Sequence, residues 1–280
     1  MVFGIETKIF DKILSMNDPF FLKLFLSFII GGVWVILVTV SADKLGSKIG
    51  GLISGLPSTL LFGLFFIGWA QSPQIAAKAT TIVPLLNGIS ALYLCSFIYF
   101  IRKNNIWITL TVSLLIWLLL SLIVILLKID NILVSLTGYL ILLAFSFYLL
   151  KYKLKVKSVQ GKKIKYSLSV IIFRGLLSGS VVAISVFLAK VGGPILGGAA
   201  SMFPAIFTST LLISYFSQGS LFSIAIAKTI MIGSVSLVVH ALAIRFSYPI
   251  LGIVTGTIIS TLVSFVSGLV IYRFIIKKTA

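Results

Sequence analysis

Residues 46–57 read GSKIGGLISGLP, and residues 193–204 read GPILGGAASMFP. The two stretches lie 147 positions apart (193 − 46) and align without a gap. They share the first glycine, the Gly-Gly pair, one serine and the closing proline. Because the chain of 280 residues holds only 7 prolines, this shared register predicts an internal duplication rather than a chance match.

The likeness continues on both sides of the two stretches. At the same spacing Gly32 matches Gly179, and a gap of three residues then brings Ala-Lys at 77–78 opposite Ala-Lys at 227–228. We therefore expect two related units, each much longer than the stretch that reveals them.

The composition is typical of a membrane protein. Hydrophobic residues make up 59% of the chain, charged residues only 10%, and the mean hydropathy is +1.21. A soluble domain is roughly half apolar and about a quarter charged, so this chain has too little polar surface to cover a globule in water. With the single cysteine Cys95 and the single histidine His240, an intrachain disulfide and a structural zinc site are both excluded. We expect no cofactor, no bound metal and no enzymatic activity, since no serine is grouped in the sequence with both a histidine and an acid as nucleophilic catalysis would need.

The fold predicted is an all-α integral membrane protein with nine transmembrane helices. A spanning helix needs about 20 apolar residues, and strands of a barrel would alternate with a period of two residues, which these runs do not. Residues 1–19 place isoleucines at helical spacing, which is typical of an amphipathic helix lying in the interface. The expected spans are 20–42, 48–70, 74–101, 106–127, 132–150, 167–189, 194–216, 220–246 and 248–274.

These spans divide into two units of four. The first unit covers residues 20–127, and the second covers 167–280 with its basic tail; residues 128–166 hold the fifth span and a basic loop. Four spans return the chain to its starting side and one more moves it across, so the second unit enters the membrane upside down. Inverted repeats are common in secondary transporters, whose sites lie between the repeats near the bilayer midplane.

Lysine and arginine predict the orientation in the membrane. The loop Lys151–Lys165 holds seven lysines and no acid, so we expect it in the cytoplasm, and alternation puts Arg102 and Lys103 on the same side. The N-terminus is then outside and the C-terminus inside the cytoplasmic membrane. The net charge of +18 does not indicate nucleic acid, because the lysines lie between apolar spans, although the same loop could also bind anionic headgroups.

The repeated stretch resembles the small GlpM-like family of bacterial inner-membrane proteins. The likeness rests on GSKIGGL at 46–52, on Pro-Ser-Thr at 57–59 and on Lys-Ala-Thr-Thr at 78–81. The second unit departs from it at Ala205, which stands where the first unit has Ser58. Members of that family are about as long as one unit, so the resemblance implies a fused pair, and a fold more than a substrate.

The glycines, serines and prolines of the two stretches form the candidate transport site. Proline removes a helix hydrogen bond, glycine permits unwinding, and paired interrupted helices in two inverted halves are typical of such a site. The alternative is close packing, since the glycines also form small-xxx-small pairs through which helix backbones touch. The candidate residues are Gly50, Gly51, Ser54 and Pro57 in the first unit and Gly197, Gly198, Ser201 and Pro204 in the second.

Polar residues inside the spans are the second candidate feature. Lys228 lies about 13 Å into its span at 1.5 Å per residue, whereas Lys78 lies near a span end, where its long side chain can snorkel to the interface. No acid follows Asp130, so the counterpart of Lys228 would be an anion or a water-filled cavity. Asn87 is expected to bond across helices at mid-span, and His240 to lie near the outer end of its span.

Together these patterns predict a transporter or facilitator of a small solute, anionic or neutral rather than cationic, with its site between the two repeats. The lack of a buried acid argues against proton coupling. The alternative function is a non-transporting accessory subunit of an envelope or lipid-handling complex. In either role the chain could form a homo-oligomer.

Overall fold

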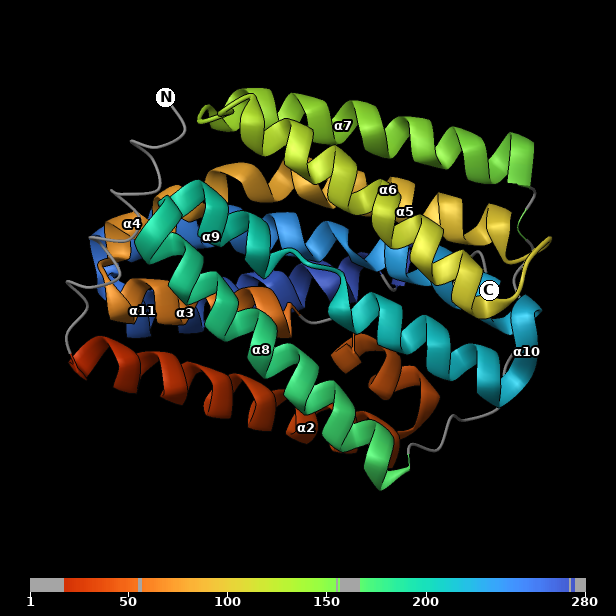
Figure 1. Ribbon diagram of the computed structural model, residues 1–280, viewed down its shortest axis with the longest axis horizontal. Coiled ribbons are helices and arrows are strands. Elements are labelled where there is room, and N and C mark those ends of the chain that lie inside the picture. The colour runs from red at the N-terminus through yellow and green to blue at the C-terminus, as the bar shows by residue number, and fades with distance from the viewer. Residues whose placement is uncertain (1–17, 55–56, 155, 157–166, 272, 275–280) are drawn as a thin grey trace, which may run out of the picture.

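The computed structural model describes residues 18–54, 57–154, 156, 167–271 and 273–274, with all of their side chains except those of 18 and 41–54. Every regular element in this part of the chain is helical (Figure 1). The interfacial helix expected at 1–19 and most of the loop Lys151–Lys165 lie outside the described residues. In chain order the elements are α2 (Asp18–Ser54), α3 (Ser58–Ala70), α4 (Pro73–Ala79), η1 (Thr80–Ile82), α5 (Val83–Phe100), α6 (Ile106–Leu126), α7 (Ile132–Tyr148), η2 (Leu149–Leu154), α8 (Leu168–Gly192), α9 (Pro194–Ser201), α10 (Ala205–Gly233) and α11 (Val235–Ile271).

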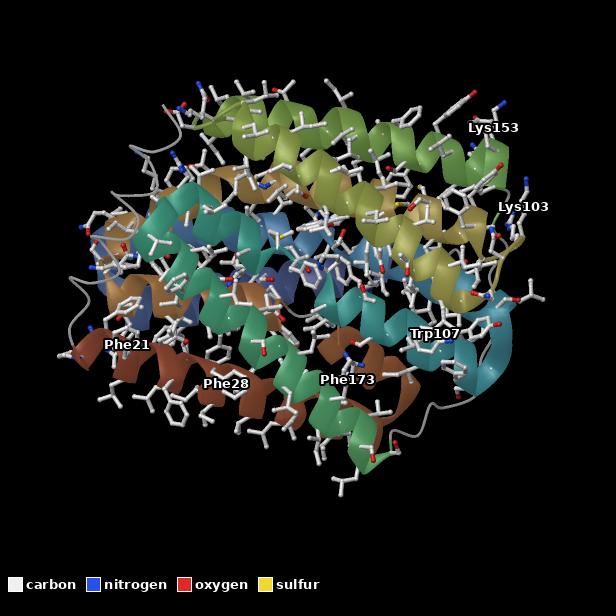
Figure 2. All side chains as sticks on the ribbon, in the orientation of Figure 1. Phe21, Phe28, Lys103, Trp107, Lys153 and Phe173 are labelled. Atoms are coloured by element: carbon white, nitrogen blue, oxygen red, sulfur yellow. The ribbon has the colours of Figure 1, made fainter. Side chains whose placement is uncertain are left out.

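The chain is an all-helical membrane protein by the length and composition of its helices. Six helical stretches of the described chain are long and apolar enough to cross a bilayer. Large apolar side chains such as Phe21, Trp107 and Phe173 are exposed on the outside of the bundle, where lipid can cover them (Figure 2). The six stretches are Pro19–Val40, Pro73–Phe100, Ile106–Leu126, Ile132–Leu154, Leu168–Gly192 and Pro194–Ile271.

Basic and aromatic side chains mark the two ends of the bundle. At one end the Arg102 guanidinium donates to the Leu154 carbonyl at 2.6 Å, so the two basic segments that follow α5 and α7 lie together. At the other end Lys23 Nζ donates to the Trp69 carbonyl at 2.9 Å and lies over the Trp69 ring. Such residues are enriched where helices leave the hydrocarbon.

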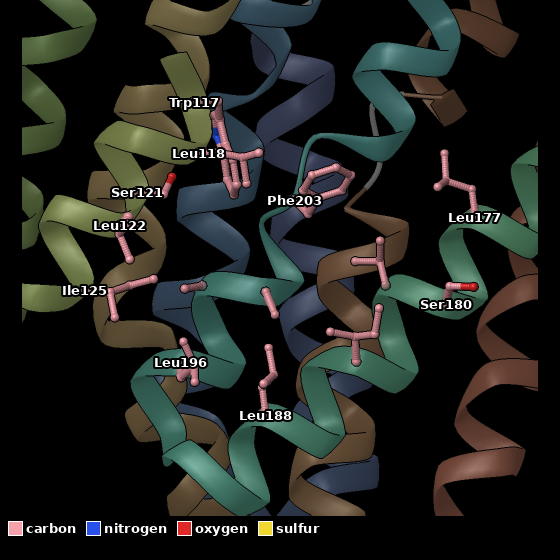
Figure 3. A pocket seen from close by; sticks show the side chains of 14 residues that line it. Trp117, Leu118, Ser121, Leu122, Ile125, Leu177, Ser180, Leu188, Leu196 and Phe203 are labelled. Carbon is pink, nitrogen blue, oxygen red and sulfur yellow. The ribbon is translucent and has the colours of Figure 1, made fainter. Parts of the chain in front are cut away.

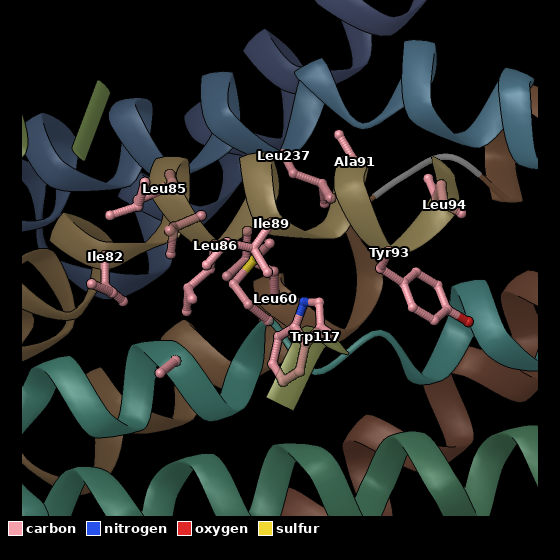
Figure 4. Packing of buried hydrophobic residues seen from close by; sticks show 14 of the residues in the cluster. Leu60, Ile82, Leu85, Leu86, Ile89, Ala91, Tyr93, Leu94, Trp117 and Leu237 are labelled. Atoms are coloured by element: carbon pink, nitrogen blue, oxygen red, sulfur yellow. The ribbon is translucent and has the colours of Figure 1, made fainter. Parts of the chain in front are cut away.

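Helix α5 is the centre of the bundle. In the apolar 18-residue window of Pro73–Phe100 the buried share is 89%, against 17% to 44% in the corresponding windows of the other five stretches. Its apolar side chains, among them Leu86 and Ile89, pack against Trp117 of α6 and Leu237 of α11 (Figure 4). The core therefore forms around a helix that lipid scarcely reaches.

Helix α7 packs on one side of α5. A Cβ at Gly138 would come within 2.6 Å of the Leu85 side chain, and a Cβ at Gly88 within 2.9 Å of Leu142, so only glycine allows this approach. The Ser135 hydroxyl of α7 also accepts a hydrogen bond from the Leu85 backbone N–H at 3.0 Å. This N–H belongs to the start of α5, where the short η1 turn interrupts the helix and leaves donors without intrahelical partners.

Helices α2 and α8 cross in backbone contact. A Cβ at Gly32 would lie 2.8 Å from the Gly175 carbonyl oxygen, and a Cβ at Gly179 would overlap the Phe28 carbonyl oxygen. Small residues at membrane helix crossings permit this approach. Any larger residue at Gly32 or Gly179 would push the two backbones apart.

Single glycines redirect the chain between helices in the C-terminal half. Gly193, Gly219 and Gly252 have φ of +90°, +83° and +75°, each with ψ near 180°, a region open essentially to glycine alone. The break expected at 217–220 is confirmed by Gly219. The boundary expected between 246 and 248 is wrong, because α11 continues through Pro249 and turns at Gly252.

The gap expected between residues 42 and 48 is also absent from the structure. α2 stays helical to Ser54, so the polar residues there mark where the chain leaves the apolar span and not where the helix ends. Polar side chains such as lysine are good helix formers, so they end an apolar run without ending a helix.

Candidate functional site at the two helix breaks

The two prolines of the repeated motif stand at matching breaks in the helices. Pro57 precedes α3 with φ −74° and ψ 51°, and Pro204 precedes α10 with φ −78° and ψ 43°. The Pro57 carbonyl accepts from Leu61 N–H at 2.7 Å, and the Pro204 carbonyl accepts from Thr208 N–H at 2.8 Å. Both prolines are buried, so both helix starts lie inside the protein.

Between α9 and α10 the chain runs in tight turns. The Phe203 N–H donates to the Ala200 carbonyl at 3.1 Å, and the Ala205 N–H donates to the Phe203 carbonyl at 2.8 Å. The Ser201 hydroxyl donates to the Gly198 carbonyl at 2.7 Å. Ser201, a candidate ligand, is therefore engaged with its own helix end, and a solute would have to compete for its hydroxyl.

Neither α3 nor α10 has a side-chain cap at its N-terminus. The first N–H groups of a helix have no intrahelical partner, and together with the helix dipole they favour an anion or an oxygen acceptor. In α3 the hydroxyl of Thr59 lies in this first turn, is buried, and has no hydrogen-bond partner among the described residues. The first turn of α3 thus holds the buried Thr59 hydroxyl as a group without a hydrogen-bond partner among the described residues.

The α10 start is linked to the central helix. The Thr208 hydroxyl donates to the Pro204 carbonyl at 2.7 Å and lies 2.9 Å from the hydroxyl of Tyr93 of α5. Tyr93 is fully buried, and its link to Thr208 fixes the position of the α10 start relative to the core.

The Gly-Gly pair of the second unit packs in a helix and is not unwound. A Cβ at Gly197 would overlap Ala189 of α8, and a Cβ at Gly198 would overlap the Ala79 carbonyl at the end of α4. The expectation that these glycines unwind is wrong for this pair, because the turning is done by Gly193 and by the Phe203–Pro204 segment. Gly50, Gly51 and Ser54 of the first unit lie in the helical backbone of α2, and their side chains are outside the described residues.

The structure brings the second break against α3 but places Lys228 at another depth. A Cβ at Gly63 of α3 would lie 2.8 Å from the Ser201 Cβ, so α3 passes the end of α9 closely. Measured along α10 from the kink at Gly219, Lys228 is about 13 Å away and Pro204 about 22 Å away, on opposite arms. Lys228 is partly buried, about 9 Å nearer to the kink than the break is.

Asn87 bonds across helices as expected. Its side-chain amide donates to the carbonyl of Ser234 at 3.0 Å and lies 3.3 Å from the Ser234 hydroxyl. The Asn87 Oδ1 atom is buried without a hydrogen bond, as is the hydroxyl of Tyr139 on α7. Asn87 therefore joins α5 to the junction of α10 and α11 and does not contact the proline breaks.

The other cations within the helices differ in exposure. Lys78 is exposed, as snorkelling requires, whereas Arg174 of α8 is only 4% exposed. Among the described residues, no group of three or more His, Cys, Asp or Glu side chains gathers as metal ligands would.

The sequence did not indicate the role of Arg245. Its guanidinium donates to the Thr81 hydroxyl at 2.8 Å and approaches the Ala77 carbonyl at 3.5 Å, so α11 holds the α4–η1 junction. The only sequence signal was a cation next to an apolar span with a threonine pair far away in the chain.

Two buried polar contacts join neighbouring helices deep in the bundle. Trp117 Nε1 of α6 donates to the Ser90 hydroxyl of α5 at 3.0 Å. His240 Nδ1 lies 3.2 Å from the Ser260 carbonyl, and the ring is fully buried. His240 therefore packs between the two arms of α11.

One family model matches part of the chain. The family is described as "Protein of unknown function (DUF3147)", and the match covers residues 24–129. No curated protein matches the chain. No solved structure matches it either.

Proposed function

We propose that this protein is a transporter or facilitator of a small anionic or neutral solute, built from two inverted repeats with its site at their interface. The observation that carries the proposal is the pair of buried helix breaks at Pro57 and Pro204, which have nearly the same backbone angles. Discontinuous helices in both halves of an inverted repeat are the usual framework of a transport site.

The junctions between helices support the duplication. One segment runs from Pro57 to Ser72, and its counterpart runs from Pro204 to Gly219. The two starts are 147 positions apart (204 − 57), and so are the two ends (219 − 72). The next helix arm starts after Asn105 in the first half and after Gly252 in the second, again 147 apart (252 − 105). The same spacing at three junctions favours two copies of one fold.

The crossing of α2 and α8 supports a twofold relation between the copies. Gly32 faces Gly175, and Phe28 faces Gly179; adding 147 to 28 and 32 gives 175 and 179. Gly32 thus contacts the counterpart of Phe28, and Phe28 contacts the counterpart of Gly32. This reciprocal pairing is the pattern of an isologous contact.

A contact between the last two spans of each copy also agrees with the repeat. In the first, Trp117 of α6 reaches Ser90 of α5. The matching position to Trp117 is Ser264 (117 + 147), whose hydroxyl donates to the Ser236 carbonyl of the same neighbouring arm at 3.1 Å. With the shift of 150 that the sequence gives to this arm, His240 matches Ser90, and its Nδ1 lies 3.2 Å from the Ser260 carbonyl of the arm that holds Ser264.

The proposed span count is nine. The stretch Pro194–Ile271 has 78 residues, which would extend about 117 Å as one helix, several times the hydrocarbon thickness of about 30 Å. Breaks at Pro204, Gly219 and Gly252 divide it into arms of spanning size when α9 is joined to the first arm of α10. In the first half α3 has only 13 residues and would need the end of α2 to complete a span, although α2 has no break at Gly46 to match the turn at Gly193. The family match over residues 24–129 overlaps the proposed first unit.

The charge of the solute follows from the donors around the breaks. Uncapped helix starts and the hydroxyl of Thr59 present hydrogen-bond donors, and the sequence has no acid after Asp130 to bind a cation. The lysine distribution favours the cytoplasmic membrane with the C-terminus inside. An oxygen-rich anion or a neutral acceptor is therefore the solute class we propose.

The test is a flux assay with the purified protein reconstituted in vesicles. A panel of small anions and neutral polar solutes is screened, and the variants Pro57→Ala and Pro204→Ala are compared with wild type. Because each substitution allows the helix to continue through the break, both should lower the flux about tenfold and by similar factors, equivalent to about 1.4 kcal/mol in the barrier. Lys228→Ala should lower the flux of anions more than that of neutral solutes.

The matched control is Pro249→Ala, an exposed proline inside α11 and away from both breaks. Its flux should equal that of wild type. Flux of no solute in the panel, or full flux in both break variants, would contradict the proposal.

The alternative is an accessory subunit that packs against an envelope or lipid-handling enzyme. The observation in its favour is the dense contact around α9, where Gly197, Gly198 and Ser201 all pack on neighbouring helices. Co-purification with one enzyme, with no flux of any solute, would favour this role.

A further inference from the structure

An apolar groove opens on the outside of the bundle between α6, α8 and α9. Its volume is about 390 Å³, and the side chains of Leu118, Leu122, Leu188 and Leu196 line its walls (Figure 3). None of these residues belongs to the proline breaks. A further lining residue, Phe203, lies next to Pro204, so the groove is a second feature that adjoins the candidate transport site.

The groove occupies one half of the membrane thickness. Along α6 it extends from Trp117 to Ile125, about 12 Å, and along α8 from Leu177 to Leu188, about 16 Å. One leaflet of hydrocarbon is about 15 Å thick, half of the roughly 30 Å core. The lining of α6 and α8 ends near their C-termini, and α9 enters at the same end, so the groove runs from that surface to mid-bilayer.

Two aromatic rings form the floor at mid-bilayer. The rings of Trp117 and Phe203 lie 5.7 Å apart at an angle of 90°. Trp117 is held in place by its hydrogen bond to Ser90, and Phe203 by the turn before Pro204. The floor is thus rigid, and it borders directly on the second helix break.

The walls of the groove face lipid. Leu118, Leu122 and Ile184 are each about half exposed, and in a membrane this surface borders on acyl chains. The groove holds almost no polar surface: the buried hydroxyl of Ser121 has no hydrogen-bond partner, and Ser180 lies at the edge. An empty apolar groove would forfeit dispersion contacts on its open side, whereas a polar solute would find only the hydroxyls of Ser121 and Ser180.

We propose that this groove binds the acyl chain of a membrane lipid, taken from the leaflet at the end where α8 terminates and α9 begins. The chain lies along α6 and α8 with its methyl end against Trp117 and Phe203. Because Phe203 immediately precedes Pro204, the bound chain touches the segment that breaks the helix. This site does not depend on transport, and it stands or falls separately from the proposed function.

The experiment measures the fluorescence of Trp117 in vesicles of phosphatidylcholine brominated near the end of the acyl chain. Trp34, Trp69 and Trp107 are replaced by Phe, so that Trp117 is the sole emitter. Although Trp117 is only 3% exposed in the protein, the brominated chain should quench most of its emission, and bromines near the headgroup should quench it much less.

Variants that fill the groove provide the decisive comparison. Ser121→Leu and Ala200→Phe place carbon inside it and should each remove more than half of the quenching, while Ser121→Ala keeps the space and should quench like the parent. A second protein that retains only the exposed Trp107 should be quenched equally with and without Ser121→Leu. Thermal unfolding shows which variants are folded. If Ala200→Phe does not fold, the comparison is made with Ser121→Leu alone.

Three results would overturn the proposal. The first is the absence of chain-end quenching of Trp117 in the parent. The second is unchanged quenching in a folded groove-filling variant, which would mean that the bromines reach Trp117 by another route. The third is loss of quenching in Ser121→Ala as large as in Ser121→Leu, which would indicate recognition of a polar group rather than an acyl chain.

Discussion

The two halves of the molecule change direction at equivalent positions by different means. In the first half the turns are made by loops whose next helices are capped by Ser72 and Asn105, with hydrogen bonds of 3.2 Å and 2.9 Å to backbone N–H groups. In the second half Gly219 and Gly252 make the turns alone, with positive φ. A cap adds a hydrogen bond to a turn that other residues can also form, whereas a glycine at these angles has no substitute. The second half should therefore tolerate substitutions at its junctions less well.

The largest effect is expected where the halves are alike, at the crossing of α2 and α8. Gly32→Ala and Gly179→Ala place a Cβ against a backbone carbonyl that cannot move aside, so each should lower the free energy of unfolding by about 3 kcal/mol. The measurement is unfolding by denaturant in mixed micelles. Gly233→Ala is the matched control, since its Cβ meets open space and helix propensity favours alanine by about 1 kcal/mol. Loss at one position without the other would break the proposed twofold relation.

The difference between the halves is tested at their junctions. Gly219→Ala and Gly252→Ala force a side chain into a region open to glycine and should each lower the free energy of unfolding by about 2 kcal/mol. At the equivalent positions Ser72→Ala and Asn105→Ala remove only a cap and should lower it by about 1 kcal/mol. Equal losses in the two pairs, measured by the same denaturation, would remove the distinction.

The smallest effect is expected at the single hydrogen bonds that join the last two spans in each half of the chain. Trp117→Phe keeps most of the ring but loses the hydrogen bond to Ser90, and Ser264→Ala loses the bond to the Ser236 carbonyl. Interhelical hydrogen bonds in membrane proteins contribute about 0.6 kcal/mol on average, so each variant should shift the free energy of unfolding by about that amount. A loss above about 2 kcal/mol in either would show that the site packs more specifically than a single bond implies.

The sequence predicted those features that depend on residues with rigid backbone rules. The two prolines marked both breaks, and the mid-span amide of Asn87 predicted a bond between helices that Ser234 completes. The end of α11's first arm was missed because Pro249 is the stronger stop signal on paper, while Gly252 makes the turn. Proline weakens a helix, but neighbouring groups in a membrane protein can absorb the lost bond.

Contacts between distant segments could not be predicted in the same way. Arg245 and Thr81 are 164 positions apart, and no periodicity connects a cation in one span with a hydroxyl in another. The groove could not be predicted either, because the sequence of an apolar face of α6 has the same pattern whether that face packs against a neighbouring helix or lines an open groove. Only the arrangement of α6, α8 and α9 leaves space there.

The place of α7 has a consequence for how such a protein could have arisen. In the proposed duplication this helix belongs to neither copy, yet Ser135 completes the start of α5 and Gly138 lets the two helices touch. Two separate single-copy subunits would lack this brace, and one face of α5 would stand bare unless another molecule sheltered it. On our proposal, a fusion of two copies through α7 would do more than set their relative direction: it would supply a permanent neighbour to the helix around which the bundle is organised.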